Sequence, residues 1–156
     1  MATFHPYLNF NGNTEEAFNF YKSVFGGEFS TLMRYDSVPA EYPITESDKN
    51  KIMHMALPLE NGTVLMGSDC MESMGHQLVM GDNFSISLMT ESEAEADKFF
   101  NGLSAGGKVT MPLDKTFWGS YFGMLTDPFG TQWLVSYDYP QETTADSSYS
   151  AQQATL

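Results

Sequence analysis

NTEEAFNFYKSVFGG (residues 13–27) has the pattern of an amphipathic helix with a marked start and a marked end. Apolar residues recur at +3, +4 and +7 from Ala17, which places them on one helix face. Asn13 followed by Glu16 is typical of a capping box, and the pair beginning at Gly26 is typical of a helix end. The sequence therefore predicts a helix between these signals.

The same pattern returns in SEAEADKFFNGLSAGG (residues 92–107), at a shift of 79 positions. Ser92 and Glu95 make a second capping box, apolar residues again follow Ala96 at helical spacing, and a glycine pair begins at Gly106. An internal repeat of this size indicates a duplicated structural module.

Each helix lies between strand candidates. One strand precedes each helix, at 4–10 and 84–90. Three strands follow each helix, near 28–36, 52–59 and 63–68 in the first half and near 108–112, 119–126 and 131–137 in the second. Helical periodicity occurs only after the first strand of each half, which favours an α+β fold of two βαβββ modules.

We place both modules, about 1–69 and 84–138, in one domain spanning residues 1–140. The long connections at about 37–50 and 70–83 are expected to be binding segments or mobile ones. Residues 141–156 are polar, small and without periodicity, so we expect a disordered tail there.

Charge and cysteine content exclude several classes of protein. The net charge is −13 and Arg34 is the single arginine, so the basic surface that nucleic acid or anionic membrane requires is missing. No apolar run reaches the length of a membrane span, and the N-terminus has no signal-peptide pattern. One cysteine, Cys70, excludes a disulfide framework. A cytoplasmic protein is the default expectation.

Three segments resemble the PhnB-like family of the vicinal oxygen chelate superfamily, which includes glyoxalases, bleomycin-resistance proteins and extradiol dioxygenases. They are PYLNFNGNTEEAFNFYKSVFGGE (6–28), IMHMAL (52–57) and GGKVTMPLDKTFWGSYFGMLTDPFGTQW (106–133). The resemblance implies that the sheets curl into an open cup, often completed by a second subunit, so we expect a homodimer. In metal-dependent members, four side chains from the first and last strands of the modules hold a divalent metal.

The resemblance places these four positions at His5, at His54, at Phe84 or Ser85, and at Leu134. The duplication agrees, because 79 added to His5 gives Phe84 and 80 added to His54 gives Leu134. Two imidazoles without a carboxylate make a poor anchor for a divalent ion. We therefore expect no full metal site; if a metal is bound, His5 and His54 hold it. Gln132, on the same strand face as Leu134, could add a weak oxygen ligand.

The two histidines have a second interpretation, as a general acid/base pair in the cup. Alternatively, each is a hydrogen-bonded, half-buried histidine of a strand. For His54 the two interpretations are balanced, and for His5 we favour the second. A third histidine, His76, lies near other possible metal ligands in a loop, where a solvated position is the simpler interpretation.

Aromatic residues offer a stacking surface for a flat or apolar ligand. In a strand, Phe117 and Tyr121 would face one way, and Trp118 and Phe122 the other. We expect one pair to pack against a helix and the other to line the cup, and we choose Trp118 for the cup. Arg34 either clamps a carboxylate or phosphate of a ligand or pairs with an acidic residue such as Asp36.

The favoured function is small-molecule binding in an aromatic cup, with the negative charge suited to a cationic ligand. The alternative is a metal-dependent lyase, isomerase or dioxygenase that uses His5 and His54. PhnB-like proteins have carried a methyltransferase label, but the glycine-rich loop that would cradle S-adenosylmethionine is missing from this sequence. We do not expect methyltransferase activity.

Overall fold

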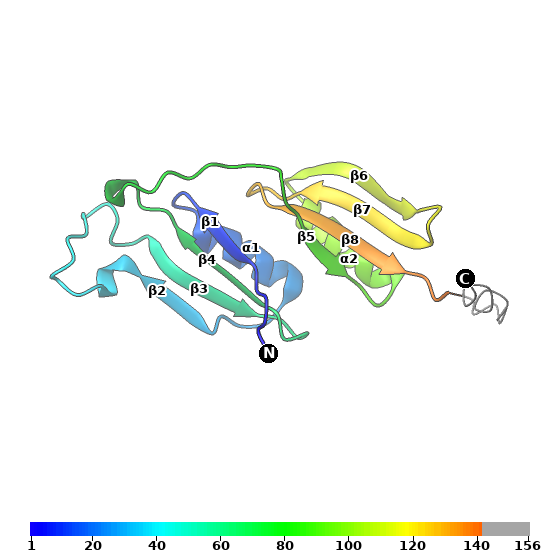
Figure 1. The fold of residues 1–156 in the computed structure, drawn as a ribbon, viewed down its shortest axis with the longest axis horizontal. Coiled ribbons are helices and arrows are strands. Elements are labelled where there is room, and N and C mark those ends of the chain that lie inside the picture. The colour runs from blue at the N-terminus through cyan, green and yellow to red at the C-terminus, as the bar shows by residue number, and fades with distance from the viewer. Residues whose placement is uncertain (142–156) are drawn as a thin grey trace, which may run out of the picture.

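Two βαβββ modules make up the part of the chain that the structure describes, as the sequence predicts (Figure 1). The computed structural model describes residues 1–141, so the tail expected at 141–156 lies outside the described residues except for Gln141. The first module contains β1 (Tyr7–Phe10), α1 (Thr14–Phe25), β2 (Thr31–Arg34), β3 (Ile52–Pro58) and β4 (Val64–Asp69). The second contains β5 (Ile86–Met89), α2 (Glu93–Ser104), β6 (Lys108–Lys115), β7 (Ser120–Thr126) and β8 (Gln132–Asp138).

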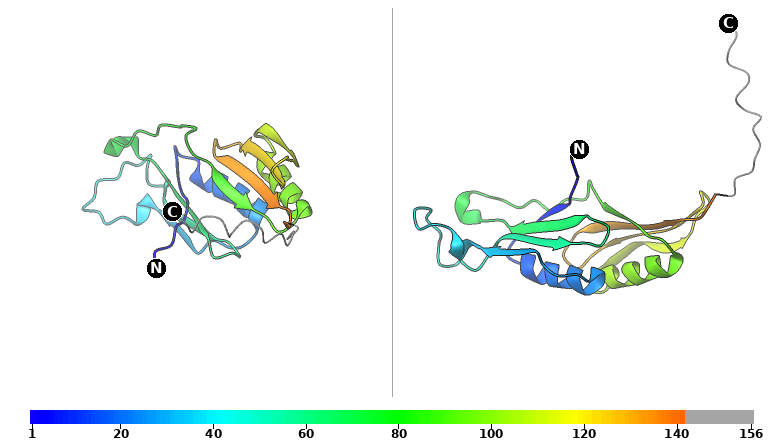
Figure 2. Two further views of the ribbon diagram at one scale, coloured as in Figure 1. Left: turned by 45° about the vertical axis from the view of Figure 1, so that its right-hand side comes forward. Right: turned by 90° about the horizontal axis from the view of Figure 1, so that it is seen from below.

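Each module forms one four-stranded sheet, and the two sheets have equivalent strand orders. The orders are β1-β4-β3-β2 and β5-β8-β7-β6, with β1–β4 and β5–β8 parallel and the other pairs antiparallel. The sheets lie side by side, and both helices cover the same side of them (Figures 1 and 2). The opposite side of both sheets is not covered by any helix of the described chain, and we call it the open face.

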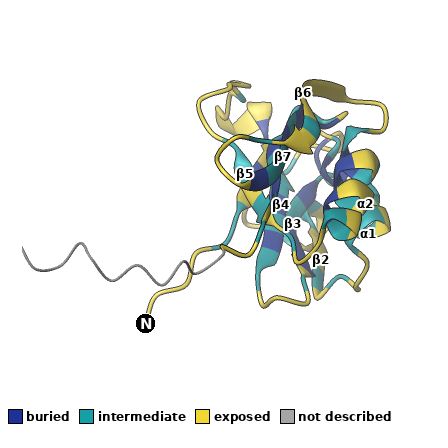
Figure 3. Ribbon diagram, turned by 90° about the vertical axis from the view of Figure 1, so that its right-hand side faces the viewer, coloured by how far each residue is buried: buried dark blue, intermediate teal, exposed yellow. Residues whose placement is uncertain are grey.

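The core lies between the helices and the sheets (Figure 3). In each module a glycine lets a phenylalanine of the module's own helix lie directly on the sheet. A Cβ atom built on Gly67 of β4 would lie 2.7 Å from the Phe18 ring, and one on Gly123 of β7 would lie 2.7 Å from the Phe100 ring. Both contacts are much closer than packed carbon atoms allow, so each glycine sets the helix–sheet distance of its module.

The two helices begin differently, although both have a capping-box sequence. Ser92 Oγ accepts the Glu95 N–H at 3.1 Å, as predicted for α2. The prediction for α1 is wrong, because the Asn13 side chain makes no capping hydrogen bond. Instead, the carboxylate of Asp69, at the end of β4, accepts the Thr14 N–H at 3.1 Å and the Thr14 hydroxyl at 2.6 Å. A distant carboxylate thus takes the place of the local cap.

The modules are joined by a buried carboxylate in the β7–β8 turn. Asp127 accepts the hydroxyl of Tyr21, on α1, at 2.7 Å and the indole N–H of Trp133, on β8, at 2.9 Å. The Phe25 ring of α1 packs against Phe99 of α2 and against Trp133. Both polar and aromatic contacts therefore fix the orientation of one module against the other. We call this region the module junction.

None of the helices in the described residues is long and apolar enough to cross a membrane.

Candidate functional site: the open face

Strand register determines which side chains lie on the open face. On the first sheet Tyr7 and Ala56 flank Met66, and His54 lies opposite Met33, while their strand neighbours point toward α1. On the second sheet the open face has a different composition. Its members from β7 and β8 are Ser120, Phe122, Met124, Thr126, Gln132, Leu134, Ser136 and Asp138.

His54 and Tyr7 form a hydrogen-bonded pair on the open face of the first module. The Tyr7 hydroxyl lies 3.2 Å from His54 Nδ1, and the two rings stack with centroids 5.7 Å apart and an interplanar angle of 21°. Tyr7 reaches His54 across the intervening strand β4. The sequence pattern indicates His54 but not Tyr7, because no local spacing links residues 47 positions apart.

His5 lies just before β1, and both of its ring nitrogens have partners. Nδ1 accepts the Val64 N–H at 3.1 Å, so the proton of the neutral ring is on Nε2, which lies 3.2 Å from the Thr3 hydroxyl. These bonds are those of a histidine that ties the N-terminal segment to β4. They favour the structural interpretation of His5 over a role in acid/base chemistry.

The structure corrects one correspondence between the modules. Gly62 and Gly130 both have positive φ in the turn before a last strand, and both β4 and β8 begin two residues later. Leu134, the third residue of β8, therefore corresponds to Met66, the third residue of β4. His54 is wrongly paired with Leu134 in the sequence analysis, because it lies on β3, whose counterpart is β7.

With this correction, the four positions implied by the family resemblance are His5, Met66, Phe84 or Ser85, and Leu134. Only His5 offers a strong metal donor, and its Nδ1 already accepts a backbone hydrogen bond. Within residues 1–141 no three His, Cys, Asp or Glu side chains are grouped so that they could hold a metal ion, at His76 or elsewhere. The residues present do not fit a divalent metal centre.

The aromatic residues divide between the two sides of the second sheet. Phe117 and Trp118 lie in the β6–β7 turn, so the strand alternation expected to orient their side chains does not apply to them. Trp118 packs edge-on against Phe122 of the open face, with ring centroids 5.8 Å apart. Tyr121 turns the other way, and its hydroxyl donates to Asp97 of α2 at 2.8 Å. Trp118 therefore borders the open face, whereas Tyr121 belongs to the helix side.

Arg34 points toward α1, away from the open face. Its guanidinium pairs with Glu15 at 2.8 Å and donates to the Asn50 carbonyl oxygen at 2.9 Å. The acidic partner is on the first turn of α1 rather than at Asp36. This arrangement matches the ion-pair interpretation of Arg34 and leaves its guanidinium engaged.

A cleft of about 130 Å³ lies between β1 and the start of β8, beneath residues 78–81 of the connection between the modules. Gln132 closes one side, where its Nε2 donates to the Gly81 carbonyl oxygen at 3.2 Å. The Met80 side chain lies directly over Gly130, where a Cβ atom would meet it at 2.6 Å. This segment therefore packs onto the β7–β8 turn of the second module.

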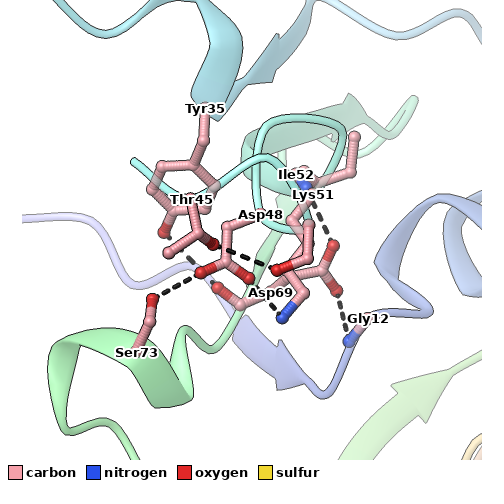
Figure 4. Close-up of polar contacts among 9 residues, drawn as sticks. Gly12, Tyr35, Thr45, Asp48, Lys51, Ile52, Asp69 and Ser73 are labelled. Carbon is pink, nitrogen blue, oxygen red and sulfur yellow. Dashed lines mark hydrogen bonds and ion pairs between the residues drawn. The ribbon is translucent and has the colours of Figure 1, made fainter. Parts of the chain in front are cut away.

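The two long connections are tied together by Asp48, which the sequence analysis did not identify (Figure 4). The buried Asp48 carboxylate lies 2.7 Å from Lys51 Nζ and accepts the Ser73 hydroxyl of the second connection. Hydrogen bonds from Lys51 and Ser73 lower the pKa of Asp48 to about 2. Nearby, Asp69 also accepts the Ile52 N–H at 2.8 Å, so this polar cluster fixes the first module's loops.

A family model described as the Glyoxalase/Bleomycin resistance protein/Dioxygenase superfamily matches residues 3–135. Protein YjdN of Escherichia coli K12 is 29% identical over 144 residues, which cover 88% of this chain and 97% of that protein. Protein PA1353 from Pseudomonas aeruginosa has a crystal structure with a TM-score of 0.79 and 38% identity, covering 88% of this chain and 98% of its own.

A second similar structure is described as a putative 3-demethylubiquinone-9 3-methyltransferase, PhnB protein, from Bacillus cereus. It has a TM-score of 0.70 and 29% identity, and the match covers 87% of this chain and 99% of that one.

Proposed function

The chain belongs to the glyoxalase/bleomycin resistance/dioxygenase superfamily, and on this basis we propose that it binds a small planar molecule on its open face. One observation carries the proposal: the open face and its rim keep large apolar side chains in contact with solvent. Trp118 is 51% exposed, and Met33, Met89 and Met111 are also exposed. Exposed apolar residues that gather on one side of a protein mark a binding surface.

We propose further that two copies of the chain close the cup as a homodimer. The open faces of both sheets lie on the same side of the molecule, and the buried module junction holds them there (Figure 2). In this arrangement one chain cannot fold its two sheets onto each other. A second copy, related by two-fold symmetry, would place each sheet opposite a sheet of the partner.

The net charge of −13 favours a neutral or cationic ligand over an anionic one. The metal-dependent lyase, isomerase or dioxygenase alternative is less well supported, because only one of the four implied positions has a strong donor. A methyltransferase role is also poorly supported. The sheets are two mixed βαβββ sheets, rather than the doubly wound parallel sheet in which a glycine-rich loop would bind S-adenosylmethionine.

A ligand screen with matched variants tests the binding proposal. Planar aromatic amines and neutral aromatic compounds are added, and the rise in melting temperature is measured for wild type, Trp118→Ala and Tyr42→Ala. Tyr42 is an exposed aromatic residue in the connection between β2 and β3, so its variant controls for loss of surface ring area. We expect Trp118→Ala to lose up to about tenfold in affinity, since an aromatic pair is worth about 0.5–1.5 kcal/mol and about 1.4 kcal/mol corresponds to a factor of ten. Equal binding by both variants would contradict the proposal.

Light scattering tests the proposed homodimer, and elemental analysis tests the metal-dependent alternative. A solution mass of twice 17.4 kDa supports the homodimer, and a mass of 17.4 kDa argues against it. Metal content is measured after incubation with Zn, Ni, Mn or Fe(II), beside a His5→Ala, His54→Ala double variant. A stoichiometric metal that the double variant loses would revive the metalloenzyme alternative.

A further inference from the structure

We propose that Tyr7 holds His54 in a single tautomer, so that Nε2–H is a fixed hydrogen-bond donor on the open face. This inference rests on the proposed binding function and adds a chemical requirement for the ligand. The ligand carries a hydrogen-bond acceptor, which we take to be an uncharged carbonyl group. His54 would then contact the ligand, and Tyr7 would be a positioning residue.

The tautomer follows from the chemistry of the pair. A phenol is a better hydrogen-bond donor than acceptor, and the unprotonated nitrogen of imidazole is a good acceptor. With Tyr7 donating across the 3.2 Å contact, His54 Nδ1 carries no proton and the neutral ring keeps its proton on Nε2. The stacked rings restrict rotation of the imidazole, so this nitrogen keeps its direction.

The position of Nε2 makes it the atom that a ligand would meet. Nδ1 is bonded to the ring carbon that joins the side chain, whereas Nε2 lies at the far end of the ring. Because His54 extends from the open face of β3, Nε2 is the ring nitrogen farther from the sheet. In the described residues, no hydrogen bond to this atom is found, although Nδ1 has one.

His5 provides a contrast within the same module. Its Nδ1 accepts a backbone N–H and its Nε2 lies by the Thr3 hydroxyl, so both nitrogens serve the fold. His54 uses one nitrogen for a side-chain partner and presents the other. Since the net charge of −13 disfavours an anionic group, a neutral carbonyl is the acceptor that suits such a donor.

The tautomer is measurable in the free protein, without any ligand. Full-length ¹⁵N-labelled wild type and Tyr7→Phe are compared at pH 8, where histidines are largely neutral, by long-range ¹H–¹⁵N correlation of the imidazole rings. The His54 signals are assigned by their loss in His54→Gln. We expect unprotonated Nδ1 and protonated Nε2 in wild type, and a shift toward a mixture of tautomers in Tyr7→Phe. The His5 signals should not move and serve as the internal reference.

Two results would overturn the inference: a protonated Nδ1 on His54 in the wild type, or identical His54 signals in Tyr7→Phe. Backbone amide spectra of the variant show whether the sheet is intact, so a folding defect is recognised separately. Because no ligand takes part, this test can succeed even if the proposed binding function fails.

The ligand class is tested with acetophenone, which has a carbonyl acceptor, and with ethylbenzene, which has a similar shape without it. We expect acetophenone to move the His54 Nε2–H signal and ethylbenzene to leave it in place. Both compounds moving Trp118 but neither moving His54 would overturn the carbonyl assignment. If neither compound moves Trp118 or His54, the proposed binding function is contradicted for planar aromatic compounds, while the tautomer result stands on its own.

Discussion

The first and second modules have the same strand order and equivalent helices, yet their open faces carry different chemistry. The first presents the Tyr7–His54 pair, and the second presents Phe122, Met124 and the neighbouring Trp118. On the helix side, each module has a glycine beneath a helix phenylalanine, although the two glycines lie on non-equivalent strands, β4 and β7. In this chain both modules have a tightly packed helix side, where a change of one methylene group is felt, whereas their exposed sides carry different side chains.

The modules also differ in where they place a buried aspartate. Asp69 accepts hydrogen bonds within the first module, from Gly12, Thr14 and Ile52. Asp127 accepts two turn amides of its own module, and also a hydroxyl from α1 of the other. The first aspartate therefore stabilises one module, whereas the second joins the two.

Among the variants that test this comparison, Asp127→Ala is expected to lose the most stability. It leaves two backbone amides, the Tyr21 hydroxyl and the Trp133 indole without their acceptor, so we expect a loss of about 3–5 kcal/mol in unfolding free energy. Urea denaturation gives the value. Tyr21→Phe removes only one of these bonds and should cost about 1 kcal/mol. Equal losses in the two variants would show that the Trp133 and turn-amide bonds to Asp127 add nothing to the bond from Tyr21.

Gly67→Ala and Gly123→Ala compare the packed sides of the two modules directly. Each new methyl group would meet a phenylalanine ring at about 2.7 Å, so each variant should lose about 1–3 kcal/mol. Gly81→Ala is the control, because a Cβ atom there meets nothing nearer than 3.8 Å. If the melting temperature falls for only one of the two variants, only one of these glycines limits the distance between helix and sheet.

The acid sensitivity of the fold should come in part from the first module. The pKa of Asp48 is about 2 in the folded chain and 3.8 for an aspartate without these partners. Its contribution to the stability of the fold is therefore complete above pH 4. This contribution is lost as the pH falls from 4 to 2. Asp48→Asn should flatten the stability profile in that window, measured by urea denaturation at each pH. If the unfolding free energy of Asp48→Asn depends on pH between 4 and 2 as steeply as that of the wild type, Asp48 is not the source of this contribution.

The smallest expected effect is on stability at alkaline pH, and it comes from Tyr121 in the second module. The hydrogen bond to Asp97 raises the pKa of Tyr121 from 10.0 to about 12. A raised pKa stabilises the fold below pH 10, and this contribution is lost as the pH rises to 12. Ultraviolet titration of tyrosinate in wild type and Tyr121→Phe should show one phenol fewer titrating near pH 12. If Tyr121→Phe instead lacks a phenol that titrates near pH 10 in the wild type, the prediction is wrong.

The α+β fold and its two modules were predictable because their signals are local. The α2 cap at Ser92 and the apolar helix faces follow from spacings of three and four residues, which a helix brings together whatever surrounds it. Strand alternation was applied to Phe117 and Trp118 although they lie in a turn, because short apolar runs give no sharp strand boundary there.

By itself the sequence therefore determined the repeat, the order of the helices and strands, and the choice of His54 and Trp118 as candidates. Only the tertiary structure decided that Asp69 caps α1, that Arg34 pairs with Glu15, that Met66 rather than His54 corresponds to Leu134, and that Tyr7 reaches His54. These partners are far apart in the chain. Strand register and the packing of one module on the other select them, and neither leaves a trace in local residue spacing.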